Sequence, residues 1–133
     1  MDRQGTPLAV ELSAANCHDS TVFDRLLDAV VPVRQPRGRP RKRPQKLHAD
    51  KGYDYGKCRR ALRKRGIKSR IARRGIESSE RRGRHRWVVE RTFAWLNRFR
   101  RLRIRYERRA DIHLAFTKIA CALITLRAIK RFC

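Results

Sequence analysis

Acidic side chains are scarce in this sequence, so those that could bind a metal ion are considered first. The 133 residues contain 12 Asp and Glu against 36 Lys and Arg. Asp50 ends the segment 46–50, which reads as a short strand, and α/β sheets place ligand sites at the carboxyl ends of strands. An ordinary turn is the alternative, because Asp shortly before Gly52 is common turn chemistry. Taken alone, this segment favours the turn.

Glu90 is the second candidate, and it is the single acid between residues 81 and 105. Helical spacing would place Arg86 four residues before it and Asn97 seven residues after it on the same face. Such a carboxylate could bind a metal ion. It could equally form an ion pair with Arg86 on a solvated face, or relieve the positive charge around it. Spacing does not decide between these readings.

The positive charge indicates the kind of partner. A net charge of +24 favours polyanions, because neutralising phosphates releases their condensed counterions. An anionic membrane surface is the competing partner. Much of the charge is carried by Arg, whose planar guanidinium suits bidentate phosphate contacts, so composition favours nucleic acid.

Two basic segments, 34–46 and 81–109, carry much of this charge. Prolines at every fourth position of 34–46 exclude a helix and an inner strand, so we expect an exposed loop. This loop is either a solvated linker or an arm that lies along phosphates. We favour the arm, because a linker has no need of seven like charges that repel one another. Its basic residues are Arg34, Arg37, Arg39, Arg41, Lys42, Arg43 and Lys46.

In the second basic segment, arginines recur every seven residues at 84, 91, 98 and 105. On a helix they would form one stripe, either simply solvated or laid along a phosphate backbone. The aromatic residues Trp87, Trp95 and Phe99 are expected to be core anchors rather than platforms for bases.

Several functional classes are disfavoured. The four cysteines (17, 58, 121 and 133) have no CxxC spacing, which argues against a zinc site or a disulfide scaffold and fits reduced thiols in the cytoplasm. Residues 1–30 lack a signal-peptide pattern. The most apolar stretch, Ile119–Leu126, is too short to span a bilayer, so we expect no membrane insertion.

The elements that must position these residues follow from the pattern of apolar residues, Gly and Pro. The sequence predicts strands at 6–12, 46–50 and 67–72, a helix at about 21–30 capped by Asp19 or Ser20, and a helix at 55–65 closed by Gly66. After a loose stretch at 75–83, the longest helix should run from Arg84 to about Tyr106. A last helix, capped by Asp111, should reach about Lys130. This order predicts an α/β fold with a small mixed sheet.

Two long motifs carry a family resemblance. They are HADKGYD at 48–54 and RHRWVVERTFAWLNRFRRL at 84–102, supported by SAANCHDS at 13–20 and RRADIH at 108–113. With them, nearly the whole chain resembles the DDE transposases of bacterial insertion sequences, in the group typified by insertion sequence five.

The resemblance implies an RNase H-like fold in which three carboxylates hold two Mg²⁺ ions for DNA cleavage and strand transfer. Asp50 matches the second acid and Glu90 the third. The family pattern around the third acid is Tyr, Arg, Glu and Lys. Arg86 and Glu90 match it, whereas Gly83 and Asn97 stand at the Tyr and Lys positions. The DNA-binding residues we expect are Arg84, Arg86, Arg91, Arg98, Arg37, Arg39, Arg41, Lys42 and Arg43.

The first acid of the family has no counterpart, because it lies on a strand before the hairpin turn with which this sequence opens. We therefore expect residues 1–133 to be a partial, N-terminally truncated catalytic domain, inactive alone. It would be a remnant or the second reading frame of a fused product, and a homo-oligomer is a further expectation. Two rival functions stay open: a non-catalytic basic nucleic-acid-binding protein, which would need no Mg²⁺, and a nuclease of the same fold.

Overall fold

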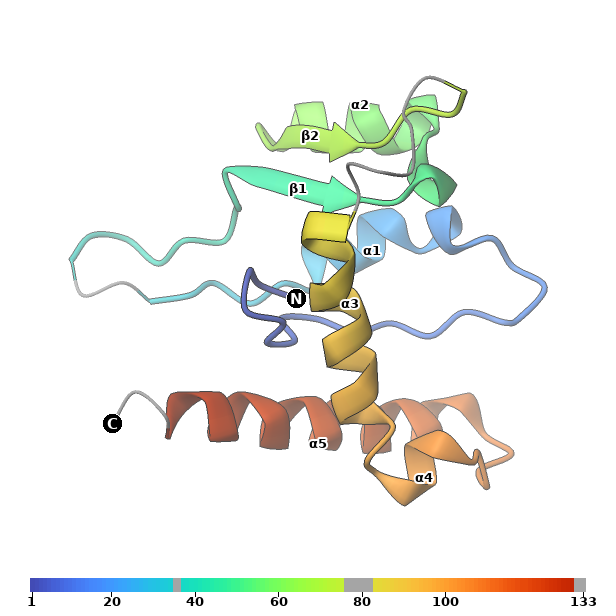
Figure 1. The fold of residues 1–133 in the computed structure, drawn as a ribbon. Helices are drawn as coiled ribbons and strands as arrows, with labels where there is room; N and C mark the ends of the chain where they lie inside the picture. Colours follow the sequence, from blue (N-terminus) through green and yellow to red (C-terminus); the bar gives the residue numbers. More distant parts are fainter. Residues whose placement is uncertain (35–36, 76–82, 131–133) are drawn as a thin grey trace. The chain divides into compact units, whose positions relative to one another are not determined.

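A computed structural model describes residues 1–34, 37–75 and 83–130, and it divides the chain into two compact units (Figure 1). One unit is Ser13–Ser78, and the other combines Met1–Leu12 with Ser79–Cys133. The described elements are, in order, η1 (Asp19–Thr21), α1 (Phe23–Asp28), β1 (Lys46–Ala49), η2 (Lys51–Tyr53), α2 (Gly56–Lys64), β2 (Lys68–Ile71), α3 (Gly83–Leu96), α4 (Arg100–Arg103) and α5 (Ala110–Ile129).

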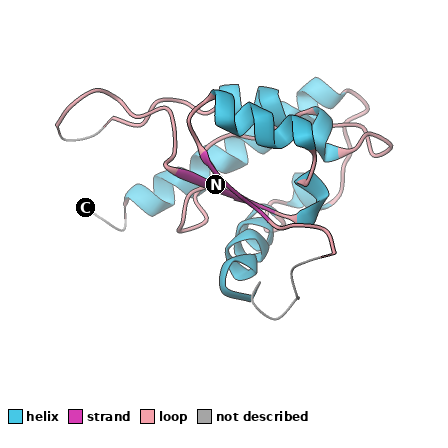
Figure 2. Ribbon diagram, turned by 90° about the horizontal axis from the view of Figure 1, so that it is seen from above, coloured by secondary structure: helices cyan, strands magenta, loops and turns pink. Residues whose placement is uncertain are grey.

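The unit Ser13–Ser78 is built on a two-stranded parallel sheet. β1 pairs with β2 in a register that runs from Lys46 opposite Lys68 to Ala49 opposite Ile71. Figure 1 shows the two strands lying side by side, and they overlap in the view from above in Figure 2, where they are magenta. Parallel neighbours need a crossover connection, and α2 provides it. The sheet therefore places Asp50 and Ala72 at the same edge, each directly after its strand.

Helix α2 supplies the centre of this unit's core. Leu62 is fully buried, and Cys58 and Ala61 share its face because residues three and four apart lie together on a helix. Phe23 of α1 and Ile71 of β2 complete the cluster. Gly66, just after the helix, has a φ of +66°, the left-handed conformation that commonly ends helices.

Most expectations for this unit are confirmed to within one or two residues: the strands at 46–50 and 67–72, and the helix at 55–65. The described residues of 34–46 are exposed, as expected of a loop, and a single antiparallel bridge joins Val33 to Arg41. The first helix differs. It begins at Phe23 after a 3-10 turn, because the His18 side chain, rather than Asp19 or Ser20, caps that turn.

The second unit packs α3 and α4 against α5. Thr117, Ala120 and Ile124, at spacings of three and four, form the buried stripe of α5. The N-terminal turn joins α3 where the Thr92 hydroxyl donates to the Gly5 carbonyl at 2.7 Å. Gly5 has a φ of +83°, and a Cβ there would lie 2.9 Å from the Thr92 hydroxyl oxygen, so this close approach requires glycine.

The helices of this unit correct three predictions. The long helix expected to reach Tyr106 ends at Leu96. There i to i+3 bonds tighten the chain into a turn, which lets α4 pack back on α5. The longest helix is instead α5, of 20 residues. It begins at Ala110 with Arg109 at its cap position, and Asp111 lies in the first turn, where it pairs with Arg109.

Three further expectations need correction. Residues 6–12 form no strand, because among the described residues no other segment pairs with them, and the described sheet is parallel rather than mixed. Trp87 is not a core anchor, since its side chain is 48% exposed. Most of the loose stretch expected at 75–83, residues 76–82, lies outside the described residues.

The apolar segment of α5 is also longer than the stretch Ile119–Leu126 expected from the sequence. The helix has 20 residues, and an 18-residue window within it has a mean hydropathy of 1.6, so by length and composition alone it could cross a bilayer. Core helices of soluble proteins meet the same criterion, and α5 is a weak indication of a membrane span.

Candidate functional site

Asp50 lies where the sequence predicted it, directly after β1 and at the first position before η2. Its carbonyl accepts a hydrogen bond from the Tyr53 backbone N–H at 3.0 Å. The side chain is exposed. The strand thus delivers the carboxylate to the sheet edge, and the 3-10 turn after it fixes the direction in which the chain leaves.

A surface hollow of about 490 Å³ surrounds this position within the unit Ser13–Ser78. The segment before η1 forms one wall, and the residues after β1 form the other. The polar residues that line it are Asn16, His18, Asp19, Asp50 and Tyr53. The fold therefore brings two acids, Asp19 and Asp50, to one hollow although 31 positions separate them in the sequence.

Tyr53 reports the electrostatics of this hollow. Burial raises the pKa of its hydroxyl, and the negative charges of Asp19 and Asp50 raise it further. The hollow is thus locally acidic in a strongly basic protein. Two acids by themselves do not define a metal site.

His18 shapes the wall formed by the segment before η1. Its Nδ1 accepts a hydrogen bond from the Ser20 backbone N–H at 3.2 Å. The ring meets Tyr55 edge-on with centroids 5.1 Å apart, and Nε2 lies 3.4 Å from the Tyr55 hydroxyl. His18 and Asp19 were not among the predicted site residues. The signal for them was the motif at 13–20.

A second set of contacts holds the loop after Asp50 in place. Tyr55 is the residue before α2, and the Arg74 guanidinium carbon lies 4.9 Å from the centre of its ring. Arg74 also donates hydrogen bonds to the Tyr55 hydroxyl and to the Lys51 carbonyl. Asp54 accepts hydrogen bonds from Arg59 and from the Arg74 backbone. The Arg74 backbone N–H, followed by Arg59, lowers the pKa of the Asp54 carboxyl. Asp54 is therefore a structural acid that supports the site.

Glu90 lies on α3 in the other unit. Its carboxylate accepts a hydrogen bond from Arg86 Nε at 2.8 Å, and both side chains are well exposed. The ion pair that the sequence left open therefore exists, and an exposed pair of this kind contributes at most about 1 kcal/mol. Asp50 and Glu90 belong to different units, so their proximity stays a prediction.

The predicted DNA-binding residues fall into two groups. On the loop, Arg37, Arg39, Arg41, Lys42 and Arg43 are all exposed. On α3, Arg86 is exposed, whereas the Arg91 guanidinium packs 4.3 Å from the Trp87 ring and 5.0 Å from the Trp95 ring. Arg91 also donates to the Gln4 carbonyl. The side chain of Arg84 lies outside the described residues, and Arg98 follows the end of α3.

The donor set near Asp50 suits a hard cation only in part. Carboxylate and amide oxygens of Asp19, Asp50 and Asn16 are the ligand type that Mg²⁺ prefers. Nevertheless, nowhere in residues 1–34, 37–75 and 83–130 do three His, Cys, Asp or Glu side chains gather as a metal site. Asn16, Asp19 and Asp50 alone therefore do not complete a metal site.

Comparison with known proteins gives a consistent result. Residues 1–125 match the family described as "Transposase DDE domain". The chain is 54% identical, over 130 residues, to a putative transposase for insertion sequence element IS402 of Burkholderia cepacia. The match covers 98% of this chain but 62% of that relative, so the chain spans less than two thirds of the relative's length. No solved structure is significantly similar.

Proposed function

The chain belongs to the DDE transposases of bacterial insertion sequences, and we propose that it forms part of the catalytic domain that cuts and joins DNA. One observation carries this proposal: Asp50 stands at the end of β1, in an acidic hollow, inside the motif on which the family resemblance rests. The +24 charge supports duplex DNA as the partner, since phosphate contacts supply affinity without reading bases.

In the proposed site Asp50 and Glu90 act as the second and third metal-binding carboxylates of an RNase H-like domain. The domain would comprise residues 1–133. Asp50 and Glu90 would hold two Mg²⁺ ions, whose chemistry when bound would be to activate the attacking oxygen and stabilise the leaving oxygen in displacement at phosphorus. For both acids to contribute, their carboxyl groups must lie within about 10 Å of each other in the assembled protein.

A site for two metal ions needs a third carboxylate besides Asp50 and Glu90. Two Mg²⁺ ions at one site would repel each other, and a further carboxylate would offset that repulsion. We propose that this acid comes from outside the present chain, either from a longer fused product or from an upstream reading frame. The Burkholderia relative is longer than this chain, since the match covers 62% of it. A cytoplasmic location and assembly as a homo-oligomer are parts of the same proposal, as is membership of the insertion sequence five group.

Cleavage of labelled element ends in Mg²⁺ tests the proposal. We expect the 133-residue chain to bind the DNA without cutting it, and a product extended to include the first Asp to cut it. In the extended product, Asp50→Asn and Glu90→Gln should each abolish cleavage. The matched controls, Asp28→Asn and Asp111→Asn, remove exposed acids from the same two units and should cut normally.

The outcomes separate the alternatives. Robust cutting by the 133-residue chain would contradict the need for a third acid. An active extended product that tolerates Glu90→Gln would remove Glu90 from the site. Salt-sensitive DNA binding with no response to Mg²⁺ in any form of the protein would instead favour a non-catalytic basic nucleic-acid-binding protein.

A further inference from the structure

A hollow of about 600 Å³ lies where α3 ends and α4 begins. It belongs entirely to the unit that contains α3, α4 and α5. Its lining consists of Asn97, Arg98, Arg100, Arg103 and Ile104. The tight turn after Leu96 creates it, because the chain folds back there instead of continuing as one helix, and three arginines gather around a single depression.

Among the described residues, these three arginines differ from their neighbours Arg101 and Arg105, which form hydrogen bonds. Within the described part of the chain, no hydrogen bond or ion pair engages the guanidinium of Arg98, Arg100 or Arg103. The lining also contains no acid. Three guanidinium groups around one hollow repel one another, so the protein alone leaves this site electrostatically unbalanced.

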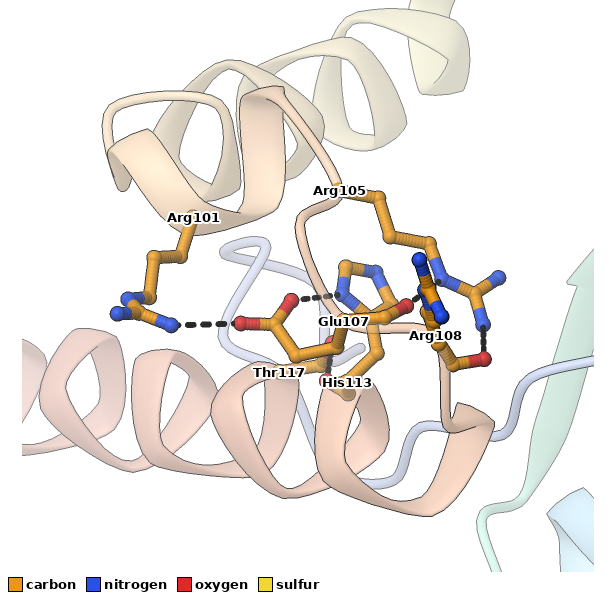
Figure 3. A network of polar contacts seen from close by, with 6 residues as sticks. All are labelled: Arg101, Arg105, Glu107, Arg108, His113 and Thr117. Atoms are coloured by element: carbon orange, nitrogen blue, oxygen red, sulfur yellow. Dashed lines mark hydrogen bonds and ion pairs between the residues drawn. The ribbon is translucent and has the colours of Figure 1, made fainter.

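The nearby acid is committed elsewhere, as Figure 3 shows. Glu107 accepts a hydrogen bond from Arg101 at 2.7 Å and contacts His113 at 3.5 Å. Burial alone would raise the pKa of Glu107, but hydrogen bonds from Arg101, its own backbone and His113 outweigh burial and lower the pKa. The carboxylate therefore stays charged and bound to these partners. Arg105 is likewise occupied, because it donates to the carbonyls of Glu107 and Arg108.

We propose that the hollow at the α3–α4 turn is a phosphate-binding site for the backbone of duplex DNA, with Arg98, Arg100 and Arg103 as its ligands. A phosphate offers the negative charge and the several acceptor oxygens that guanidinium groups bind bidentately. The Asn97 amide adds a donor, and the half-exposed Ile104 offers an apolar edge beside the sugar. This inference rests on the proposed DNA-binding function and locates one of its contact points.

Salt titration of duplex binding with charge-matched variants tests the site. The hollow variant is Arg98→Gln with Arg100→Gln and Arg103→Gln. The control variant, Lys118→Gln with Arg127→Gln and Lys130→Gln, removes the same charge from exposed positions of α5 in the same unit. The slope of log K against log salt counts neutralised phosphates, so the hollow variant should lower it by about 2 to 3 and the control by less than about 1.

A second measurement keeps the test independent of folding of the variants. In the unsubstituted chain, duplex DNA should protect Arg98, Arg100 and Arg103 from an arginine-specific reagent and leave Arg127 reactive. Inorganic phosphate at the same phosphate concentration should protect them weakly, which distinguishes a DNA backbone site from a site for the free ion. Stronger protection by inorganic phosphate would overturn the assignment to DNA.

The results also separate this inference from the function beneath it. Equal slopes for the two variants, with normal binding by the unsubstituted chain, would overturn the phosphate site and leave DNA binding intact. Absence of any duplex binding by the unsubstituted chain would overturn both. If RNA protects the three arginines from the reagent and duplex DNA does not, the hollow binds RNA and the proposal is contradicted.

Discussion

Arg59 donates two hydrogen bonds to one carboxylate oxygen of Asp54, from Nε at 2.9 Å and from Nη2 at 2.6 Å. The same Nη2 group donates to the Ile71 carbonyl at 3.1 Å. The other oxygen of Asp54 accepts the Arg74 backbone N–H at 3.0 Å. Four residues after Asp50, this acid thus ties α2 to the end of β2. A neighbouring acid that does not line the hollow thus joins the elements around the sheet edge that carries Asp50.

Replacing Asp54 with Asn should therefore destabilise the unit Ser13–Ser78. The Asn side chain has the same shape as Asp, but its NH₂ group would face hydrogen-bond donors of Arg59 or Arg74 that then lack an acceptor. Leaving a donor without an acceptor in the folded chain lowers stability more than exchanging a hydrogen bond for one to water. Thermal unfolding followed by circular dichroism measures the effect. Asp28→Asn is the control, since Asp28 pairs with Arg65 at the surface and its loss should matter less. Equal shifts in the two variants would contradict the structural role of Asp54.

The same acid predicts a pH dependence of stability. The pKa of Asp54 lies below its usual value of 3.8 in the folded chain, because of the Arg74 backbone N–H and then Arg59. Its contribution to stability is therefore complete above that value and disappears as pH falls through the lower, folded pKa. The difference in unfolding midpoint between the unsubstituted chain and Asp54→Asn should shrink between about pH 7 and about pH 2. A difference that stays constant would show that charge plays no part.

Leu62 should be the most costly core position of this unit, because it is fully buried at the centre of α2. Leu62→Ala leaves a cavity and should lower the free energy of unfolding by about 2–5 kcal/mol. Urea unfolding of both proteins measures the change. Val31→Ala serves as the control because Val31 is 69% exposed, and its effect should stay within about 0.5 kcal/mol. A loss below about 1 kcal/mol for Leu62→Ala would contradict the assigned core.

The basic loop should contribute to DNA affinity through charge alone. Replacing Arg37, Arg39 and Arg43 with Gln should reduce the slope of log K against log salt by about 2 to 3 on duplexes of unrelated sequence. The control replaces Arg60, Arg63 and Lys64, exposed residues of α2 in the same unit, with Gln. If both triple variants change the slope alike, the loop is a solvated linker and binding reflects net charge. A slope that differs between DNA sequences would indicate base contacts instead.

Local patterns determined much of the fold. Apolar alternation and turn residues specify β1, β2 and α2, because short-range periodicity and a left-handed Gly66 leave few other conformations. The position of Asp50 at the end of β1 followed from the same signals. The exposed loop was equally predictable, since proline spacing excludes regular structure whatever surrounds it. The family could be identified because its two motifs are long and occur in order.

Contacts between distant residues decided the rest. Heptad spacing of arginines suggested one helix through Arg105, yet α3 ends at Leu96 because packing of α4 against α5 outweighs local helix propensity. The arginine hollow exists only because of that break. Likewise, no pattern in the sequence placed Asp19 beside Asp50 or joined Asp54 to Arg59 and Arg74. The sequence alone determined which side chains could carry charge and metal chemistry, whereas the tertiary structure decided which of them meet, because burial and hydrogen bonding are satisfied across the whole unit at once.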